Sequence, residues 1–200
     1  MQIITKVYDG YAQAHGAVDE LLTAGIPMSN ISVLGSRTDP DQFFTNAEEG
    51  SEAGAGAGVG AVLGGAAGLL AGLGLMAIPG LGPVVAAGWL ASTALGAAAG
   101  GATGGIVGSL ISSGVSEGDA NVYSEVVRRG GMLVSVQAED HDVAKVQAIL
   151  GAHLPINADE QRAVFRDSGW DEFDPHAPPY ESTRAAAQRD QRLLKSKSLI

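Results

Sequence analysis

The stretch VYDGYAQAHGAVDELLTAGIPMSNISVL (residues 7–34) has the pattern of a strand, a helix and a second strand. Its first strand belongs to the β-branched segment QIITKVYD, and the segment NISVLGS is the second. Between them, Gly25 and Pro27 stand where a helix ends. The helix has one apolar face, made by Ala14, Val18, Leu21 and Leu22. Residues 1–35 are therefore predicted to form a first βαβ half.

Residues 116–160 repeat this pattern after one additional helix. The segment SEGD fits a capping box with Ser116 as the N-cap and Asp119 three residues later, so a helix should begin there and stop at Gly130-Gly131. GMLVSVQAE is predicted as a strand and LPINAD as a short last strand. The helix between them has an apolar face made by Val143, Val146, Ile149 and Leu150.

The two halves share a local sequence pattern at LLTAGIP (21–27) and ILGAHLP (149–155). Matching residues keep one constant offset: Leu22 and Leu150, Ala24 and Ala152, Ile26 and Leu154, Pro27 and Pro155. Two βαβ halves packed as a four-stranded antiparallel sheet, with helices on one face, give a ferredoxin-like α+β sandwich. The alternative is chance, because short helix–loop–strand units recur in many folds.

The chain between the halves changes in character. Residues 36–52 are polar and acidic, a predicted linker, whereas residues 53–116 contain no Asp, Glu, Lys, Arg or His. Residues 53–115 are predicted to be an inserted α-helical hairpin with arms at about 59–78 and 84–112. The chain should reverse between these arms at residues that break helices, namely Pro79, Gly80, Gly82 and Pro83.

Glycine recurs at every fourth position in both arms, which on a helix places one glycine nearly above the next. Each costs about 1 kcal/mol relative to alanine in an exposed helix, and close backbone contact between helices offsets that cost. The stripe is therefore predicted to be a helix-packing and homo-oligomer interface, a glycine zipper. Its residues are Gly56, Gly60, Gly64, Gly68, Gly72, Gly96, Gly100, Gly104 and Gly108.

The sequence allows three interpretations of this glycine-rich segment. Residues 59–78 would span about 30 Å as a helix, enough to insert into a lipid bilayer. The acidic residues beside the uncharged stretch are unusual for a membrane anchor. A core formed by several copies in water is the second alternative, and a low-complexity Ala/Gly linker is the third.

The overall charge limits the classes of partner. The net charge of -10 argues against nucleic acid, whose phosphates require clustered Lys and Arg. The N-terminal sequence lacks a basic region followed by an apolar one, so the predicted location is cytoplasmic, with association at the inner face of the cell membrane if the hairpin inserts.

The sequence carries no pattern that indicates catalysis, a cofactor or a metal ion. There is no cysteine, and the 4 histidines do not pair at metal-ligand spacing. The glycine run lacks the acidic residue or the Gly-Lys-Ser/Thr end that phosphate-binding loops need. We therefore expect no enzyme activity, no cofactor and no metal site.

The segment 161–200 is predicted to be a polar tail. DSGWDEFDPHAPPYE combines acidic residues and prolines with three aromatic residues, and the end of the chain is basic. Aromatic residues in a polar, proline-rich segment are typical of docking onto a groove of another chain. The predicted docking residues are Trp170, Phe173 and Tyr180.

The opening stretch resembles the N-terminal module of the group that contains the heat-induced stress protein YflT and general stress protein 17M. AIPGLGPVVAAG (77–88) and RRGGMLVSV (128–136) are similar to segments of bacterial proteins of unknown function that share an Ala/Gly hairpin. The resemblance covers about residues 1–160 and implies a link to the general stress response. That group has no assigned catalytic residues, so none is carried over, and the tail departs from its pattern.

The sequence thus predicts a non-catalytic, stress-associated protein that forms homo-oligomers through a membrane-inserting glycine-zipper hairpin. A soluble self-assembling particle or filament, with the zipper helices as its core, is one alternative. A small-ligand-sensing ferredoxin-like module is another, because paired βαβ halves bind regulators between subunits.

Overall fold

The computed structural model describes residues 1–36, 74–78, 82–90, 105–177 and 180, with the backbone alone described for 36, 74–78 and 82–87. Strands and helices follow one another along the chain, interrupted by one 3-10 turn, η1. In order they are β1 (Gln2–Tyr8), α1 (Tyr11–Thr23), η1 (Met28–Asn30), β2 (Ile31–Ser36), β3 (Gly74–Ile78), β4 (Gly82–Ala87), α5 (Gly105–Ser112), α6 (Glu117–Arg128), β5 (Met132–Ala138), α7 (Val143–Ala152) and α8 (Ala158–Asp167).

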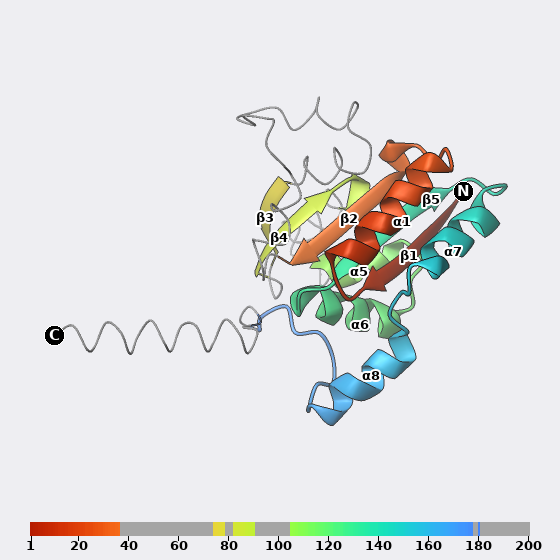
Figure 1. Ribbon diagram of the computed structural model, residues 1–200. Helices are drawn as coiled ribbons and strands as arrows, with labels where there is room; N and C mark the ends of the chain where they lie inside the picture. The colour runs from red at the N-terminus through yellow and green to blue at the C-terminus, as the bar shows by residue number, and fades with distance from the viewer. Residues whose placement is uncertain (37–73, 79–81, 91–104, 178–179, 181–200) are drawn as a thin grey trace, which may run out of the picture.

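The strands form one antiparallel sheet in the order β1-β5-β2-β4-β3, so the chain is an α+β protein (Figure 1). Strand β5 comes late in the sequence, yet it lies between β1 and β2 and is antiparallel to both. Strands β1 and β2 therefore run parallel to each other with β5 inserted between them, which is a split βαβ arrangement. The hairpin of β3 and β4 extends the sheet on the side of β2.

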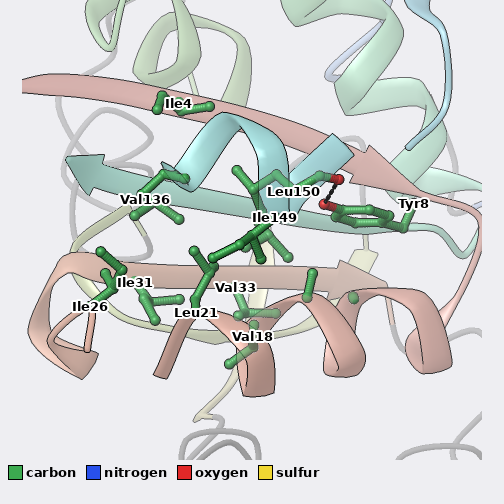
Figure 2. Packing of buried hydrophobic residues seen from close by; sticks show 14 of the residues in the cluster. Ile4, Tyr8, Val18, Leu21, Ile26, Ile31, Val33, Val136, Ile149 and Leu150 are labelled. Carbon is green, nitrogen blue, oxygen red and sulfur yellow. Dashed lines mark hydrogen bonds between the residues drawn. The ribbon is translucent and has the colours of Figure 1, made fainter. Parts of the chain in front are cut away.

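One face of the sheet packs against α1 and α7, as predicted from the apolar faces of these two helices. Leu21 and Leu150 are fully buried between the helices and the strands (Figure 2). The hydroxyl of Tyr8 in β1 donates a 2.9 Å hydrogen bond to the backbone carbonyl of Leu150 in α7. Because Tyr8 and Leu150 belong to different repeats, this buried bond ties the two halves of the chain together.

The opposite face is also covered, which differs from the expectation of helices on one face. Helices α5, α6 and α8 contribute to a second core with Val7, Leu34 and Leu133 of the central strands. The sequence pattern does not indicate this layer, because it marks α6 only as a helix that connects the two halves. The buried residues of α6 include Val122 and Val127, which pack toward the sheet.

The segment LPINAD does not form the predicted last strand. It makes one strand-like contact, a 2.8 Å hydrogen bond from the N–H of Ile156 to the carbonyl of Val7. Pro155 has no N–H to donate to a ladder, and the Asn157 side chain accepts hydrogen bonds from the N–H groups of Asp159 and Glu160 at 2.9 and 3.3 Å. These bonds start helix α8, so the chain leaves the sheet after a single bond.

The predicted helical hairpin is wrong near its tip. Residues Gly74–Ile78 and Gly82–Ala87 are strands β3 and β4, and the latter pairs with β2. Val84 and Val85 are β-branched and favour a strand. Pro83 stands near the start of β4, before its pairing with β2 begins, and the beginning of a strand is a position where proline is tolerated. The chain does reverse between Ile78 and Gly82, which pair with each other.

Of the remaining hairpin and zipper residues, Gly82, Pro83 and Gly108 are among the described residues and the others are not. Pro79, Gly80 and most of the zipper lie outside the described residues. Gly82 and Pro83 open β4, and Gly108 lies in α5, a helix that packs against α6. The zipper glycines outside the described residues are Gly56, Gly60, Gly64, Gly68, Gly72, Gly96, Gly100 and Gly104.

Candidate interaction site on helix α6

Helix α6 begins at the predicted capping box and ends where it approaches β1. The Ser116 hydroxyl accepts a hydrogen bond from the N–H of Asp119 at 3.2 Å, so the predicted N-cap is confirmed. At the other end, the N–H of Gly131 bonds to the carbonyl of Val126 at 2.9 Å. A Cβ atom on Gly131 would lie 2.8 Å from the carbonyl oxygen of Tyr8. Glycine is therefore required where the chain passes from α6 into β5.

A buried carboxylate organises the last turn of α6. The side chain of Glu125 is 1% exposed, yet it is fully paired. Both Glu125 oxygens accept bonds from Arg128 at 2.7 Å, and Oε1 accepts a further bond from Arg129 at 2.6 Å. The hydrogen bond with Glu125 raises the pKa of the Arg128 guanidinium. Because an unpaired buried charge is costly, the two arginines are held in fixed positions at the surface of the helix.

These arginines hold aromatic side chains from the C-terminal part of the chain. The Arg129 guanidinium lies 4.3 Å from the ring centroid of Phe165 in α8 and 5.3 Å from that of Tyr180. The Arg128 guanidinium lies 5.5 Å from the Tyr180 ring. Cations over aromatic faces attract the ring quadrupole. The Arg128–Arg129 pair, which stands in the motif RRGG, thus connects the buried Glu125 to the tail.

The aromatic residues of the tail pack on their own chain, which corrects the prediction that they dock on another one. Phe173 is buried in the core under α6, and its N–H donates to the Asn121 side chain at 3.2 Å. Trp170 packs beside this core, edge-on to Phe165 at 5.4 Å. With Tyr180 on the arginine pair, all three predicted docking residues lie against α6 or α8.

Helix α8 explains how the tail returns to the core, and the sequence contains a signal for it. Asn157 followed three residues later by Glu160 is a helix start of the capping-box type. The composition of residues 161–167 nevertheless favours a polar tail, because its only large apolar residues are Val164 and Phe165. Phe165 is the one of these two that is buried.

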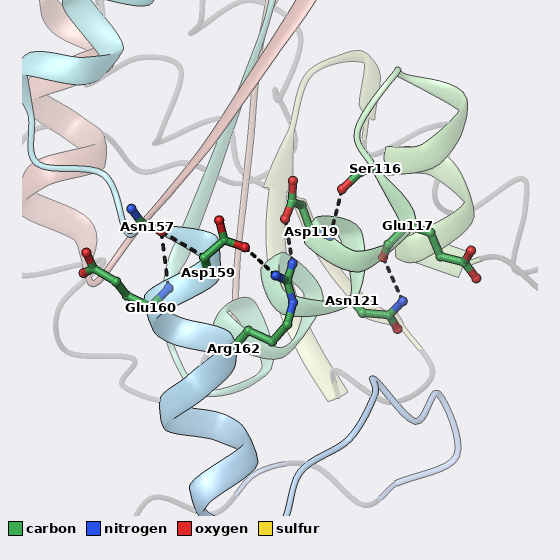
Figure 3. A network of polar contacts seen from close by, with 8 residues as sticks. All are labelled: Ser116, Glu117, Asp119, Asn121, Asn157, Asp159, Glu160 and Arg162. Atoms are coloured by element: carbon green, nitrogen blue, oxygen red, sulfur yellow. Dashed lines mark hydrogen bonds and ion pairs between the residues drawn. The ribbon is translucent and has the colours of Figure 1, made fainter.

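A polar network joins the start of α8 to the start of α6 (Figure 3). The Arg162 guanidinium donates to Asp119 at 2.7 Å and to Asp159 at 2.5 Å. The bond with Asp159, followed by that with Asp119, raises the pKa of Arg162. The same Asp119 follows the Ser116 cap, so Arg162 fastens α8 to the first turn of α6. This arrangement positions helices and gives both Asp119 and Asp159 a cationic partner.

The described residues offer no assembled group for metal binding. In residues 1–36, 74–78, 82–90, 105–177 and 180, no set of three or more His, Cys, Asp or Glu side chains could hold an ion. In the acidic segment at 139–142, two carboxylates pair with separate cationic groups. Asp140 pairs with the N-terminal amine at 2.9 Å, and Asp142 pairs with Lys145 at 2.8 Å. The Lys145 bond lowers the pKa of Asp142.

Two further findings bear on what the chain is. In the part of the chain that the structure describes, no helix has both the length and the apolar character needed to cross a membrane. Comparisons of the chain with models of protein families, with curated proteins and with solved structures find no match. The resemblance to the stress-protein group therefore stays a prediction.

Proposed function

We propose that this chain is a non-catalytic assembly module that associates with copies of itself through glycine-bearing helical faces. The observation that carries this proposal is the orientation of α5. Ile106, Ser109 and Leu110 are buried on the side of α5 that meets the core. Gly108 stands two residues, or about 200°, from Ile106 around the helix axis. It therefore lies on the side of α5 turned away from this core.

The sequence before α5 continues the same row. Gly96, Gly100 and Gly104 precede Gly108 at four-residue spacing, which a helix would align on one face. A row without side chains allows the backbone of a second helix to approach closely. Since the contacts of α5 with the described core use its other side, the partner that we propose for this row is a helix of a second copy.

We also propose that the folded part is a ferredoxin-like unit with a reduced fourth strand. Its support is the spatial order of the segments. In the order 154–157, β1, β5, β2, the first segment contributes one hydrogen bond, that of Ile156 to Val7, and the other three are paired strands. Helices α1 and α7 pack on the same face of these strands, as the two helices of that fold do.

A lipid bilayer is the second candidate medium for the helix contacts of the uncharged segment 53–116. Its lack of charged side chains is the observation that favours this candidate. The stress-associated role is proposed on the resemblance alone.

The test is the oligomeric state of the full chain, measured by size-exclusion chromatography with light scattering. Gly108→Leu fills the proposed contact row and should shift the chain to smaller species, with the far-ultraviolet circular dichroism unchanged. Gly151→Leu is the matched control, because a Cβ atom at this helical glycine of α7 meets nothing within 4 Å. Gly64→Leu combined with Gly68→Leu should abolish the oligomers.

A monomeric wild-type chain, or oligomers that persist in Gly108→Leu and in the double variant, would contradict the proposal. Separating cell lysate into membrane and soluble pools distinguishes the two media. An oligomer found only with the membranes supports the bilayer, and one found only in the soluble pool supports a protein core.

A further inference from the structure

Strand β1 lies at the edge of the sheet, so its side away from β5 pairs with no described strand. One hydrogen bond shows which backbone groups of β1 point to this outer side. The carbonyl of Val7 accepts from Ile156 on the side away from β5. Along a strand, the N–H and C=O groups of successive residues point to alternate sides. Those of Ile3 and Thr5 therefore point to the same outer side as Val7, while those of Ile4 and Lys6 point to β5.

No described residue forms a hydrogen bond with the outward N–H and C=O groups of Ile3 and Thr5. Among the hydrogen bonds of the described chain, the outer edge of β1 takes part in the bond of Ile156 to Val7 alone. The Thr5 hydroxyl is bonded to the Ser135 hydroxyl of β5 at 2.8 Å in the buried layer. This bond fixes the orientation of β1 at Thr5, so the outward N–H and C=O groups of Thr5 are positioned to pair with a further strand.

A groove of about 530 Å³ runs along this edge, within the range of ordinary ligand sites. Residues 2–6 of β1 line it, together with residues of both helical layers. Ser116 and Tyr123 of the α6 layer stand on one side, and Gln147 and Gly151 of α7 stand on the other. The groove is therefore walled on both faces of the sheet.

The two walls of the groove leave room for a single extended peptide beside β1, but not for the β1 edge of a second copy. A peptide in the strand conformation needs one inter-strand spacing, about 4.8 Å, beside β1. The β1 strand of a second copy carries the same two walls, which would meet those of the first copy. In addition, the Ile156 segment of that copy stands beside its own Val7 and blocks full pairing.

The charge of the groove specifies the chemistry of the peptide. Lys6 lines the groove and is partly buried, and its ammonium group forms no ion pair with any residue that the structure describes. The other charged residue of the lining, Asp119, is paired with Arg162 at 2.7 Å. A carboxylate on the incoming segment therefore complements the groove, whereas a cationic side chain does not.

We propose that the open edge of β1 binds an extended, acidic peptide segment of a partner protein as an added strand. The main chain of the segment bonds to Ile3 and Thr5, and its carboxylate pairs with Lys6. Strand addition of this kind draws its affinity from main-chain hydrogen bonds. This inference is independent of the glycine-mediated association proposed above.

The test titrates the full chain with the capped peptide acetyl-Thr-Val-Glu-Val-Thr-amide and follows the backbone amide resonances. Binding should shift the resonances of Ile3 and Thr5 more than those of Ile4. A peptide of the same sequence with N-methylated backbone amides should not bind. Replacing its Glu by Lys should weaken binding about twofold to fivefold, as should Lys6→Gln.

A pair of protein variants isolates the main-chain contact. Ile3→Pro removes an outward N–H that β5 does not use, which an edge strand tolerates, and should weaken binding about tenfold. Ile3→Ala keeps this N–H and should bind as the wild type does.

Three results would overturn the proposal: no binding of the acidic peptide at millimolar concentration, equal binding of the N-methylated peptide, or undiminished binding to a folded Ile3→Pro. Protection of the Ile3 and Thr5 amides without peptide that is lost on dilution would assign the edge to a second copy, and would also overturn it. If Ile3→Pro does not fold, the N-methylated peptide decides.

Discussion

The first repeat, α1 to β2, and the second repeat, α7 to Asn157, share the pattern of residues 21–27 and 149–155. In this alignment α7 ends one residue later than α1, and the path of the chain differs beyond each helix. After α1, Gly25 adopts the left-handed conformation, with φ at 87°, and Ile26 turns inward to 4% exposure. After α7, the residue matching Gly25 is His153, and the left-handed conformation moves on to Leu154, with φ at 53°. Leu154, the counterpart of Ile26, is 82% exposed.

A shared local sequence pattern therefore does not determine how a segment joins the sheet. In the first repeat, η1 separates Pro27 from β2 and carries the chain to a position beside β5. In the second repeat, Pro155 is followed directly by Ile156 and the Asn157 cap of α8. The first repeat therefore gains a paired strand, and the second leaves the edge of β1 open.

The largest expected effect comes from truncating the matched leucines of the two repeats. Leu150 is fully buried, so Leu150→Ala should lower the free energy of unfolding by about 2–5 kcal/mol. Leu22 packs at the margin of the same core, so Leu22→Ala should lower it by about 1 kcal/mol. Urea denaturation measures both. Equal losses would mean that the two leucines are packed equivalently, and would contradict the difference in their burial.

A smaller effect is expected from cutting the bond between the repeats. Tyr8→Phe leaves the Leu150 carbonyl without its 2.9 Å donor and should cost about 1–3 kcal/mol in urea denaturation. Tyr123→Phe is the control, since it removes the hydroxyl of a second buried tyrosine, to which no described residue forms a hydrogen bond. A loss in Tyr8→Phe no larger than in the control would show that the buried bond does not join the halves.

The burial of the Tyr8 phenol also predicts how stability depends on pH. Burial raises the pKa of Tyr8, so the folded chain keeps the phenol proton more tightly than the unfolded chain does. The corresponding stability is full below about pH 10, the ordinary tyrosine pKa, and falls as the pH rises above it. Tyr8→Phe should show a shallower loss of stability over this range, although Tyr11 and Tyr123, whose pKa values burial also raises, still contribute.

The smallest effects concern the helix ends themselves. Leu154→Gly relieves a left-handed conformation at an exposed residue and should raise the free energy of unfolding by up to about 1 kcal/mol. Gly25→Ala imposes such a conformation on a residue with a Cβ and should lower it by about 1 kcal/mol. Thermal unfolding followed by circular dichroism measures both. Shifts of the same sign would contradict the comparison.

Sequence reasoning predicted the parts of the fold in which local signals agree. The apolar face of α1, the cap at Ser116 and the strand β5 are all present in the structure. It did not predict β3 and β4, because glycine and alanine carry little information on secondary structure and the helical period of the glycines outweighed Val84-Val85. It also missed the second helical layer, since no local pattern states which face of a sheet a connecting helix will cover.

Of the candidate site, the sequence predicted the three aromatic residues of the tail, but neither the surface on which they pack nor the Glu125–arginine cluster. Trp170, Phe173 and Tyr180 do dock, yet they dock on their own chain, because α8 brings them back to α6. That outcome depends on the long-range bonds of Arg162 to Asp119 and of Phe173 to Asn121. Contacts across such sequence separations leave no periodic trace, so the sequence of the tail taken in isolation does not reveal them.

Native-state hydrogen exchange of the backbone amides in the full chain tests most directly whether the second repeat leaves β1 open. If the edge of β1 is open, exchange alternates along the strand: the Ile4 and Lys6 amides, which point to β5, exchange slowly, and the Ile3 and Thr5 amides exchange much faster. Equally slow exchange at all four amides would contradict it, because the outer edge of β1 would then be hydrogen-bonded in the native protein.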